Sequence, residues 1–294
     1  MHRLTHSFTL FRVQLHKPQQ LPLLAAEITE TEILRAALLE KPWDEVRGHV
    51  WRVGNVSEIS DDAMVFFIGK EQQTTFGTVG ADGDFHEAEA VVAPNTLVVV
   101  DLQYQLLAIA HRVQLSQSVY AVASRIRTLL ASSQVVLETE CKVSVAAVND
   151  PTDFIRVLET AAAVVKFKVI YGLPNVWDAD DFQKPMQDTT RILGASEGAA
   201  VFKGEDLRRS PLVRLAKASS AIGKKAVAWV KKSAGDRVVT VKQKNNPVIL
   251  EQEIVTEDSS VSAQDVAYVE QSQPLRIADL IVRRMREEYL KIRR

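Results

Sequence analysis

The chain has a single cysteine, Cys141, which excludes an internal disulfide and a zinc site built on a pair of thiols. Long hydrophobic runs are also missing, because apolar runs such as 96–100 and 106–110 are far shorter than the roughly 20 residues of a bilayer-spanning helix. Residues 1–17 alternate and then turn polar, unlike the unbroken apolar segment of a secretion signal. We therefore expect a cytoplasmic protein without membrane association.

Signatures of catalysis and nucleotide binding are missing too. The glycine-rich segment 77–83, GTVGADG, is not followed by a helix with an apolar face, as a phosphate-binding loop would be. Neither G-x-S-x-G nor a closely spaced pair of histidine ligands occurs. His86 stands beside Glu87 and Glu89, where an exposed turn explains the polarity and a metal or acid–base pair is the alternative. We expect no cofactor and no enzymatic activity.

The composition that is present is typical of a folded globular protein, with 46% hydrophobic and 25% charged residues. A length of 294 residues suits two domains, because single cores stop growing at about 250–300 residues. The pattern predicts the α+β class. A mainly antiparallel β domain with one or two helices is expected at 1–149, and a domain of alternating helices and strands at 150–294, ending in a long amphipathic helix.

Apolar alternation predicts the strands of the first domain. Residues 7–15 alternate at period two, and 97–110 is apolar almost throughout, which predicts a central strand buried on both faces. Residues 134–148 predict an amphipathic strand with Cys141 on its apolar side, in a structural role. The glycine and aspartate cluster at 77–85 is typical of a hairpin loop. In the second domain, a hairpin is predicted from strands on either side of 245–246.

Charge is distributed unevenly, although the formal net charge is only −1. Residues 203–245 hold 12 basic and 3 acidic residues, whereas residues 246–274 hold no basic residue and 6 acidic ones. A partner senses such local patches, because charges act over a Debye length of about 8–10 Å at physiological salt. The basic segment is therefore the strongest indication of a binding surface.

Ser210 and Pro211 are typical of a helix start, and 211–233 predicts one helix with its cations on one side and Trp229 on the other. The residues expected to contact phosphates are Arg214, Lys217, Lys224, Lys225, Lys231, Lys232, Lys242 and Lys244. No acid interrupts this side of the helix, which favours a nucleic-acid surface. Two alternatives remain: the acidic segment 246–274 or an acidic partner covers the cations, or they form an ordinary solvated face.

A second hypothesis is a magnesium-dependent nuclease or toxin. Glu140, Cys141 and Lys142 match the acid-x-lysine half of a restriction-type nuclease signature, in which acids bind Mg²⁺ and lysine stabilises developing charge. Asp101 and Glu138 would complete the set. The polar side of an amphipathic strand explains the same residues, so this function is kept as the alternative. A third hypothesis is a subunit that docks an acidic protein partner or forms a homo-oligomer.

The succession of DLQYQLLAIAHR at 101–112, a capped helix, an amphipathic strand and DPTDFIRVLETAAAVVKFKVIYGLPN at 150–175 resembles, in layout, uncharacterised bacterial proteins of anti-phage defence and mobile-element loci. The resemblance covers residues 97–245 and includes no catalytic motif, so it transfers no site residue. It implies a bacterial setting and a sensor or accessory role near nucleic acid. Our leading expectation is a non-enzymatic protein that binds the phosphate backbone of DNA or RNA.

Overall fold

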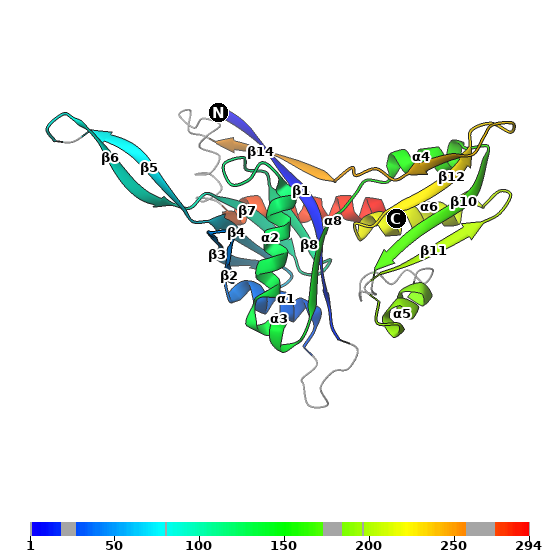
Figure 1. Ribbon diagram of the computed structural model, residues 1–294, viewed down its shortest axis with the longest axis horizontal. Coiled ribbons are helices and arrows are strands. Elements are labelled where there is room, and N and C mark those ends of the chain that lie inside the picture. Colours follow the sequence, from blue (N-terminus) through cyan, green and yellow to red (C-terminus); the bar gives the residue numbers. More distant parts are fainter. Residues whose placement is uncertain are drawn as a thin grey trace.

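The computed structural model, shown in Figure 1, contains two antiparallel sheets and a projecting hairpin. The α+β class predicted from the sequence is confirmed. Among the described residues, none of the helices is long and apolar enough to cross a lipid bilayer. The structure describes residues 2–18, 28–79, 81–172, 184–195, 197–256 and 274–293.

The first sheet is antiparallel throughout and is built around the long strand β1. Its strands, in spatial order, are β14 (Ile249–Thr256), β1 (His2–His16), β8 (Leu106–Ala110), β7 (Asn95–Asp101), β4 (Ala63–Lys70), β3 (His49–Ser60) and β2 (Trp43–Val46). The strand β9 (Lys142–Ala147) pairs with the second half of β1, on the edge where β14 pairs with the first half. This long β1 therefore joins segments from both ends of the chain.

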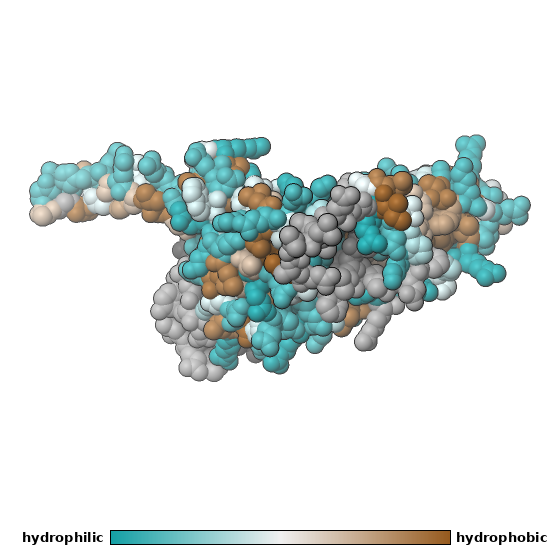
Figure 2. Space-filling view, turned by 90° about the horizontal axis from the view of Figure 1, so that it is seen from below, coloured by the Kyte–Doolittle hydropathy of each residue, from teal (hydrophilic) through white to brown (hydrophobic). Residues whose placement is uncertain are grey.

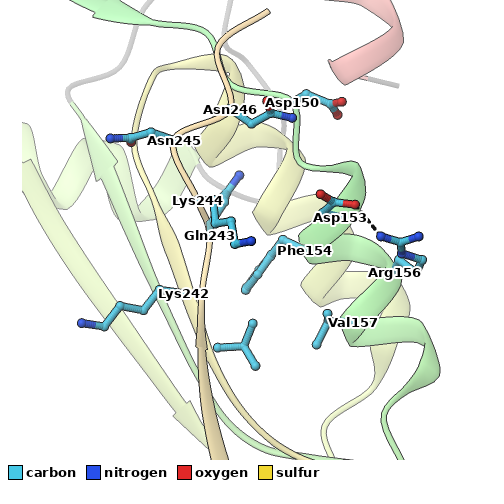
Figure 3. Close-up of a pocket in the computed structure, with 11 residues that line it drawn as sticks. Asp150, Asp153, Phe154, Arg156, Val157, Lys242, Gln243, Lys244, Asn245 and Asn246 are labelled. Carbon is cyan, nitrogen blue, oxygen red and sulfur yellow. Dashed lines mark hydrogen bonds and ion pairs between the residues drawn. The ribbon is translucent and has the colours of Figure 1, made fainter.

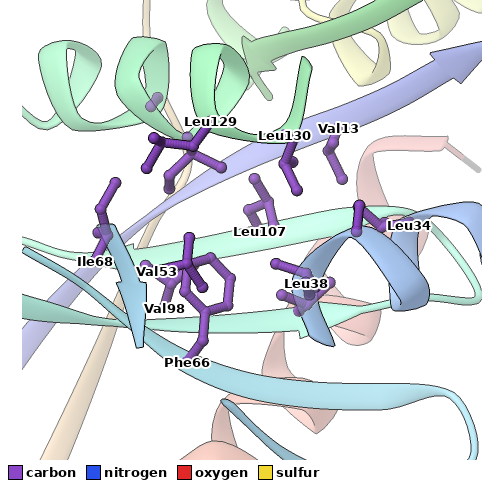
Figure 4. Close-up of a cluster of buried hydrophobic side chains, with 14 of the residues drawn as sticks. Val13, Leu34, Leu38, Val53, Phe66, Ile68, Val98, Leu107, Leu129 and Leu130 are labelled. Carbon is purple, nitrogen blue, oxygen red and sulfur yellow. The ribbon is translucent and has the colours of Figure 1, made fainter. Parts of the chain in front are cut away.

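Helices cover both faces of the first sheet. The helices α1 (Glu30–Leu39), α2 (Val119–Ala131) and α3 (Gln134–Glu138) pack on one face, and α8 (Pro274–Arg293) packs on the other. Figure 4 shows the first of these cores, in which Leu38 and Leu130 from the helices meet Phe66 and Val98 from the sheet. Because both faces are buried, β4 and β7 are apolar at nearly every position instead of alternating.

Two predicted strands of this region are corrected by the structure. The apolar stretch 97–110 is a hairpin of β7 and β8, and its turn ends at Gln105, which has a positive φ of 52°. The stretch 134–148 begins with the helix α3 and becomes strand β9 only from Lys142, after a turn at Glu140 with φ of 50°. Apolar runs of this length fit a strand, a hairpin or a helix equally well, so periodicity alone misplaced both turns.

The second sheet has four antiparallel strands and one helical layer. Its order is β11 (Glu197–Lys203), β10 (Ala163–Gly172), β12 (Ala226–Lys231) and β13 (Val239–Lys242). The helices α4 (Thr152–Thr160) and α6 (Arg209–Ala221) pack on one face, with Phe154, Leu215 and Phe167 in the shared core. The short helix α5 (Lys184–Ile192) lies against β10 and β11 and contributes Met186 to this core.

The predicted helix at 211–233 is wrong. The helix α6 ends at Ala221, and Gly223 turns the chain into strand β12 with a positive φ of 70°. A Cβ atom at this position would lie 2.5 Å from the Cβ of Ala146, so the turn also packs against the first unit without room for a side chain. The residues that follow alternate between buried and half-buried, which is the period of a strand.

The predicted second domain at 150–294 is also corrected. Strand β14 pairs with β1, and α8 packs against the first sheet through Ile281, Met285 and Tyr289. Residues 249–256 and 274–293 therefore belong to the first unit, and the second unit ends before Ile249. The hairpin predicted around 245–246 does not form, because β13 pairs with β12 instead of β14.

The strands β5 (Gln72–Val79) and β6 (Phe85–Val92) form a two-stranded hairpin, as the glycine and aspartate cluster predicted. We call residues 72–92 the arm. In Figure 1 the arm projects from one end of the longest axis of the molecule, and the second sheet lies at the other end. The two ends are thus separated by the whole first unit.

Candidate functional site

The face of the second sheet opposite α4 and α6 has no covering element among the described residues, and we call it the open face. Strand alternation decides which side chains it carries, because successive residues point to opposite sides of a sheet. Buried residues such as Phe167 and Val230 point toward the helices. The central and cationic residues of the open face are Lys166, Lys168, Ile170, Val201, Lys203, Val227, Trp229, Lys231, Thr240 and Lys242.

The strand register places the cations in neighbouring positions. Lys166 pairs with Lys203 of β11 on one side and with Trp229 of β12 on the other. One step along, Lys168 pairs with Val227, which in turn pairs with Lys242 of β13. Directly opposite side chains in an antiparallel pair have Cβ atoms only about 4.5–5.5 Å apart, and like charges at that distance repel. The folded protein therefore holds unfavourable charge density on this face.

Trp229 lies within the cationic surface. The Lys166 ammonium sits 4.1 Å from the centroid of the Trp229 ring, a cation–π contact that contributes about 0.5–1 kcal/mol at exposed sites. The indole is half-buried, and Lys166 is in contact with its ring. An aromatic ring flanked by cations is thus available on a flat surface.

On the described strands of the open face, alternation assigns one acidic residue, Glu197 at the start of β11. Its carboxylate accepts a hydrogen bond from Lys224 at 2.8 Å. This hydrogen bond and the charge of Lys224 lower the pKa of Glu197, and nearby Lys168 lowers it further. Lys168, Lys203, Lys231 and Lys242 form no ion pair with any residue that the structure describes. The acid is thus neutralised locally, and the lysines are left uncompensated.

The cations predicted from the sequence do not share one surface. Lys231 and Lys242 lie on the open face, but Arg214 and Lys217 are on α6, behind the same sheet. The others lie around the ends of the strands, with Lys224 and Lys225 in the turn before β12, Lys232 after β12, and Lys244 after β13.

Three lysines of the open face were missed by the sequence reasoning: Lys166, Lys168 and Lys203. A signal for the first two exists, because Lys166 and Lys168 alternate with the buried Phe167 and Val169 in the β10 sequence. Lysine at every second position of a strand predicts a solvated sheet face. The dense charge at 224–244 fits a helix wheel as well, but residues 226–231 form the strand β12.

The residues of the nuclease hypothesis are not brought together. Asp101 is fully buried on the α8 side of the first sheet, where its carboxylate accepts hydrogen bonds from Arg286 and from the Tyr104 amide. Burial raises its pKa, while Arg286 opposes the shift. Glu138 ends α3, which packs on the opposite side of the sheet, and the exposed Lys142 begins the edge strand β9. Among the described residues, no three His, Cys, Asp or Glu side chains are grouped so that they could hold a metal ion.

The remaining candidate residues have local explanations. His86 lies 3.2 Å from Asp82 in the exposed turn of the arm, where Asp82 also accepts from the Asp84 amide. The pKa of Asp82 is lowered first by that backbone hydrogen bond. Cys141 is buried beside α2 and α3, and burial raises the pKa of its thiol.

The acidic segment predicted to cover the cations is described only in part. Residues 249–256 form β14 at the edge of the first sheet, away from the open face. Residues 257–273 lie outside the described residues.

No protein-family model matches this chain, and no curated protein sequence matches it. The function is therefore inferred from the geometry of the open face.

Proposed function

We propose that the protein binds single-stranded nucleic acid on the open face of the second sheet, with the lysines contacting phosphates. The observation that carries the proposal is one uncovered sheet face that combines five lysines with an accessible tryptophan and one acid that is already paired. In this proposal the protein is a non-enzymatic accessory or sensor component of a bacterial defence system, the role that its resemblance in layout implies.

The charge pattern supports a polyanionic ligand. Lys166 and Lys203 stand directly opposite each other, so a phosphate between them would replace repulsion by two attractions. Binding of phosphates by lysine releases condensed counterions, which makes affinity fall steeply as salt rises. If all five lysines contact a single strand, the slope of log K against log salt is expected to be about −3 to −4.

The shape of the face favours a single strand over a duplex. Four strands at a spacing of about 4.8 Å make a surface roughly 14 Å wide, and a flat surface does not enter the grooves in which duplex sequence is read. Single strands expose their bases, which stack on aromatic side chains of open sheets. We propose that a base displaces the Lys166 ammonium from Trp229 and that Lys166 then meets the adjacent phosphate. One ring gives one stacking position, so little sequence preference is expected.

A matched pair of variants tests the proposal by titration with fluorescent single-stranded and double-stranded DNA and RNA at two salt concentrations. Lys168→Gln/Lys203→Gln removes two charges from the open face, and Arg214→Gln/Lys217→Gln removes two from α6 behind the same sheet. We expect the first variant to weaken single-strand binding by roughly tenfold or more at low salt, and to flatten the salt dependence, because two phosphate contacts are lost.

The α6 variant is expected to bind within about twofold of the wild type, because its cations point away from the open face. Equal losses in the two variants would assign the binding to overall charge and would overturn the role of the open face. Thermal unfolding of each variant checks that the fold is intact.

A further inference from the structure

The arm is not paired with any other described part of its own chain. Strands β5 and β6 pair only with each other among the described strands, and most of their side chains are exposed on both faces. Phe85 is 87% exposed, and Val79 and Val91 are each 66% exposed. An isolated two-stranded hairpin is at best marginally stable in water, and exposed apolar strands tend to be covered. Figure 2 shows the arm as a narrow extension on which apolar and polar residues lie next to each other.

The two faces of the arm differ in chemistry. Glu87 and Glu89 lie on one face, whereas the opposite face carries Phe76, Ala88 and Ala90 from neighbouring register positions. Residues 72–92 contain four acids and no lysine or arginine. The strongly exposed apolar residues Val79, Phe85 and Val91 share the face of Glu87 and Glu89, whereas the opposite face is uncharged apart from His86 near its tip.

At the other end of the molecule, a groove of about 340 Å³ lies between α4 and the extended segment that leaves the second sheet. Phe154 and Val157 point from α4 toward this segment, as Figure 3 shows, and Val241 of β13 completes the apolar lining. Lys242 points away from the groove, to the open-face side. The acids of the groove have partners of their own, since Asp153 pairs with Arg156 and Asp150 accepts from the Thr152 amide.

The outer edge of β13 is not paired with any strand that the structure describes. β13 ends the order of the second sheet, with β12 on its inner side only. The Gln243 amide donates to the Ala226 carbonyl of the neighbouring chain segment. In an antiparallel ladder, every second residue directs its backbone N–H and C=O groups toward the partner strand. The backbone groups of Thr240 and Lys242, at the alternate positions, therefore point away from β12. The Gln243 side chain also accepts from the Ala226 amide at 3.0 Å, which fixes this end of the edge.

We infer that strand β6 of one copy adds to the β13 edge of a second copy and extends its second sheet. An added strand continues both faces of the sheet that it joins. Glu87 and Glu89 then stand on the side of Lys242, and cross-strand pairs of opposite charge each contribute about 0.2–1 kcal/mol. The small residues Ala88 and Ala90 face the groove, next to the half-buried Val157 of α4.

The contact must form between copies, because the arm and the β13 edge lie at opposite ends of the longest axis. A contact between two different surfaces is heterologous, so each copy can donate its arm to one neighbour and accept the arm of another. The product is a ring or a growing chain of subunits. Nucleic-acid binding on the open face is a separate property, because the two surfaces share only Thr240 and Lys242 of β13.

The test uses two complementary variants of the full chain, measured by light scattering after size exclusion. In the armless variant, residues 73–91 are replaced by Asn-Gly, which joins the paired Gln72 and Val92 through a favoured hairpin turn. In the second variant, Thr240→Pro removes an outward amide from the β13 edge, a position where edge strands tolerate proline.

We expect wild-type protein to form species larger than a monomer, increasing with concentration and decreasing with salt, and each variant alone to be monomeric. An equimolar mixture of the two variants is expected to give a heterodimer that grows no further, because one variant supplies only an arm and the other only an edge. Monomeric wild type at every concentration, or no complex in the mixture, would overturn the inference. Self-association of Thr240→Pro would assign the contact to arm–arm pairing instead.

Binding of single-stranded nucleic acid separates this inference from the proposed function. The armless variant keeps the open face, so its monomer is expected to bind with an affinity within about twofold of the wild type. Loss of assembly with retained binding would support both statements, whereas retained assembly in Lys168→Gln/Lys203→Gln with loss of binding would show that the two surfaces act independently. Thermal unfolding checks that each assembly variant is folded.

Discussion

The two sheets of this protein are both antiparallel, but they differ in what covers them. The first sheet has helices on both faces, and its central strands β4 and β7 are apolar at almost every position. The second sheet has helices on one face, and its central strand β10 places Lys166 and Lys168 between buried residues. The first sheet therefore provides stability through two cores, and the second has one face that no described helix covers.

The largest expected effects come from exchanging an aromatic residue for alanine in each sheet. Phe66→Ala empties a site in the first core, where Phe66 is fully buried, and should lower the free energy of unfolding by about 3–5 kcal/mol. Trp229→Ala on the open face should cost less than about 1 kcal/mol of stability, because its ring is half-buried. Urea denaturation measures both changes.

The same two variants should rank in the opposite order for binding. Trp229→Ala is expected to weaken single-strand binding by about 1–3 kcal/mol, the contribution of one stacked base, while Trp229→Phe retains most of it. Phe66→Ala should bind normally at temperatures where it remains folded. If Trp229→Ala binds as tightly as the wild type, the ring is not a stacking platform and the ligand contacts only lysines.

An intermediate effect is expected from the ion pair that anchors α8. Arg286 donates to the buried Asp101 and also to Asp62, at 2.8 Å. Arg286→Ala leaves the Asp101 carboxylate buried without its cation, and we expect a loss of about 2–3 kcal/mol, less than for a fully buried pair because Arg286 is partly exposed. Lys291→Ala, which removes an exposed pair with Glu288 on the same helix, is the control and should cost under about 1 kcal/mol.

The double variant Arg286→Ala/Asp101→Asn sharpens this comparison. Without the carboxylate, the missing cation no longer leaves a buried charge, so part of the lost stability should return in the same denaturation experiment. If the double variant is less stable than Arg286→Ala, the hydrogen bonds that the Asp101 carboxylate accepts, such as that from the Tyr104 amide, matter more than its charge.

Much of the fold follows from the sequence, because long apolar periodicity and turn residues decide class and elements. The hairpin at 77–85 was predicted from glycine and aspartate, which tolerate the backbone angles of tight turns. The boundary between α6 and β12 was not predicted, because the pattern of 211–233 fits one long helix as well as a helix followed by a short strand. The helix ends at the turn of Gly223, which packs against Ala146 of the first unit. This contact joins segments far apart in the chain, so the local sequence does not reveal it.

The candidate site was predicted in part for the same reason. Lys231 and Lys242 were assigned to a cationic surface, but their companions on that surface come from β10 and β11, up to 76 residues away along the chain from Lys242 to Lys166. Charge counts within a segment cannot bring such residues together, because antiparallel pairing does so in three dimensions. The return of β14 and α8 to the first sheet is likewise a pairing with β1 that no local pattern specifies.

The smallest expected effect concerns the one acid on the strands of the open face. Lys224 lowers the pKa of Glu197, so this ion pair stabilises the fold above the carboxyl's unfolded pKa and the contribution is lost as pH falls through the lowered folded pKa. Because Glu197 is half exposed, Glu197→Gln should cost under about 1 kcal/mol at neutral pH. It should nevertheless bind single strands about two- to fivefold tighter at low salt, because a negative charge has left the face.

Lowering the pH separates these two consequences of Glu197→Gln. Below the folded pKa of Glu197 the wild-type carboxyl is protonated, so its affinity should approach that of the variant, and the two stability curves should converge as well. Titrations of both proteins at neutral and acidic pH measure the difference, with Asp236→Gln, in the exposed loop between β12 and β13, as a control that changes charge off the strands. Weaker binding by Glu197→Gln at neutral pH would mean that the Lys224–Glu197 pair positions the neighbouring lysines, and that the order of the open face matters more than its net charge.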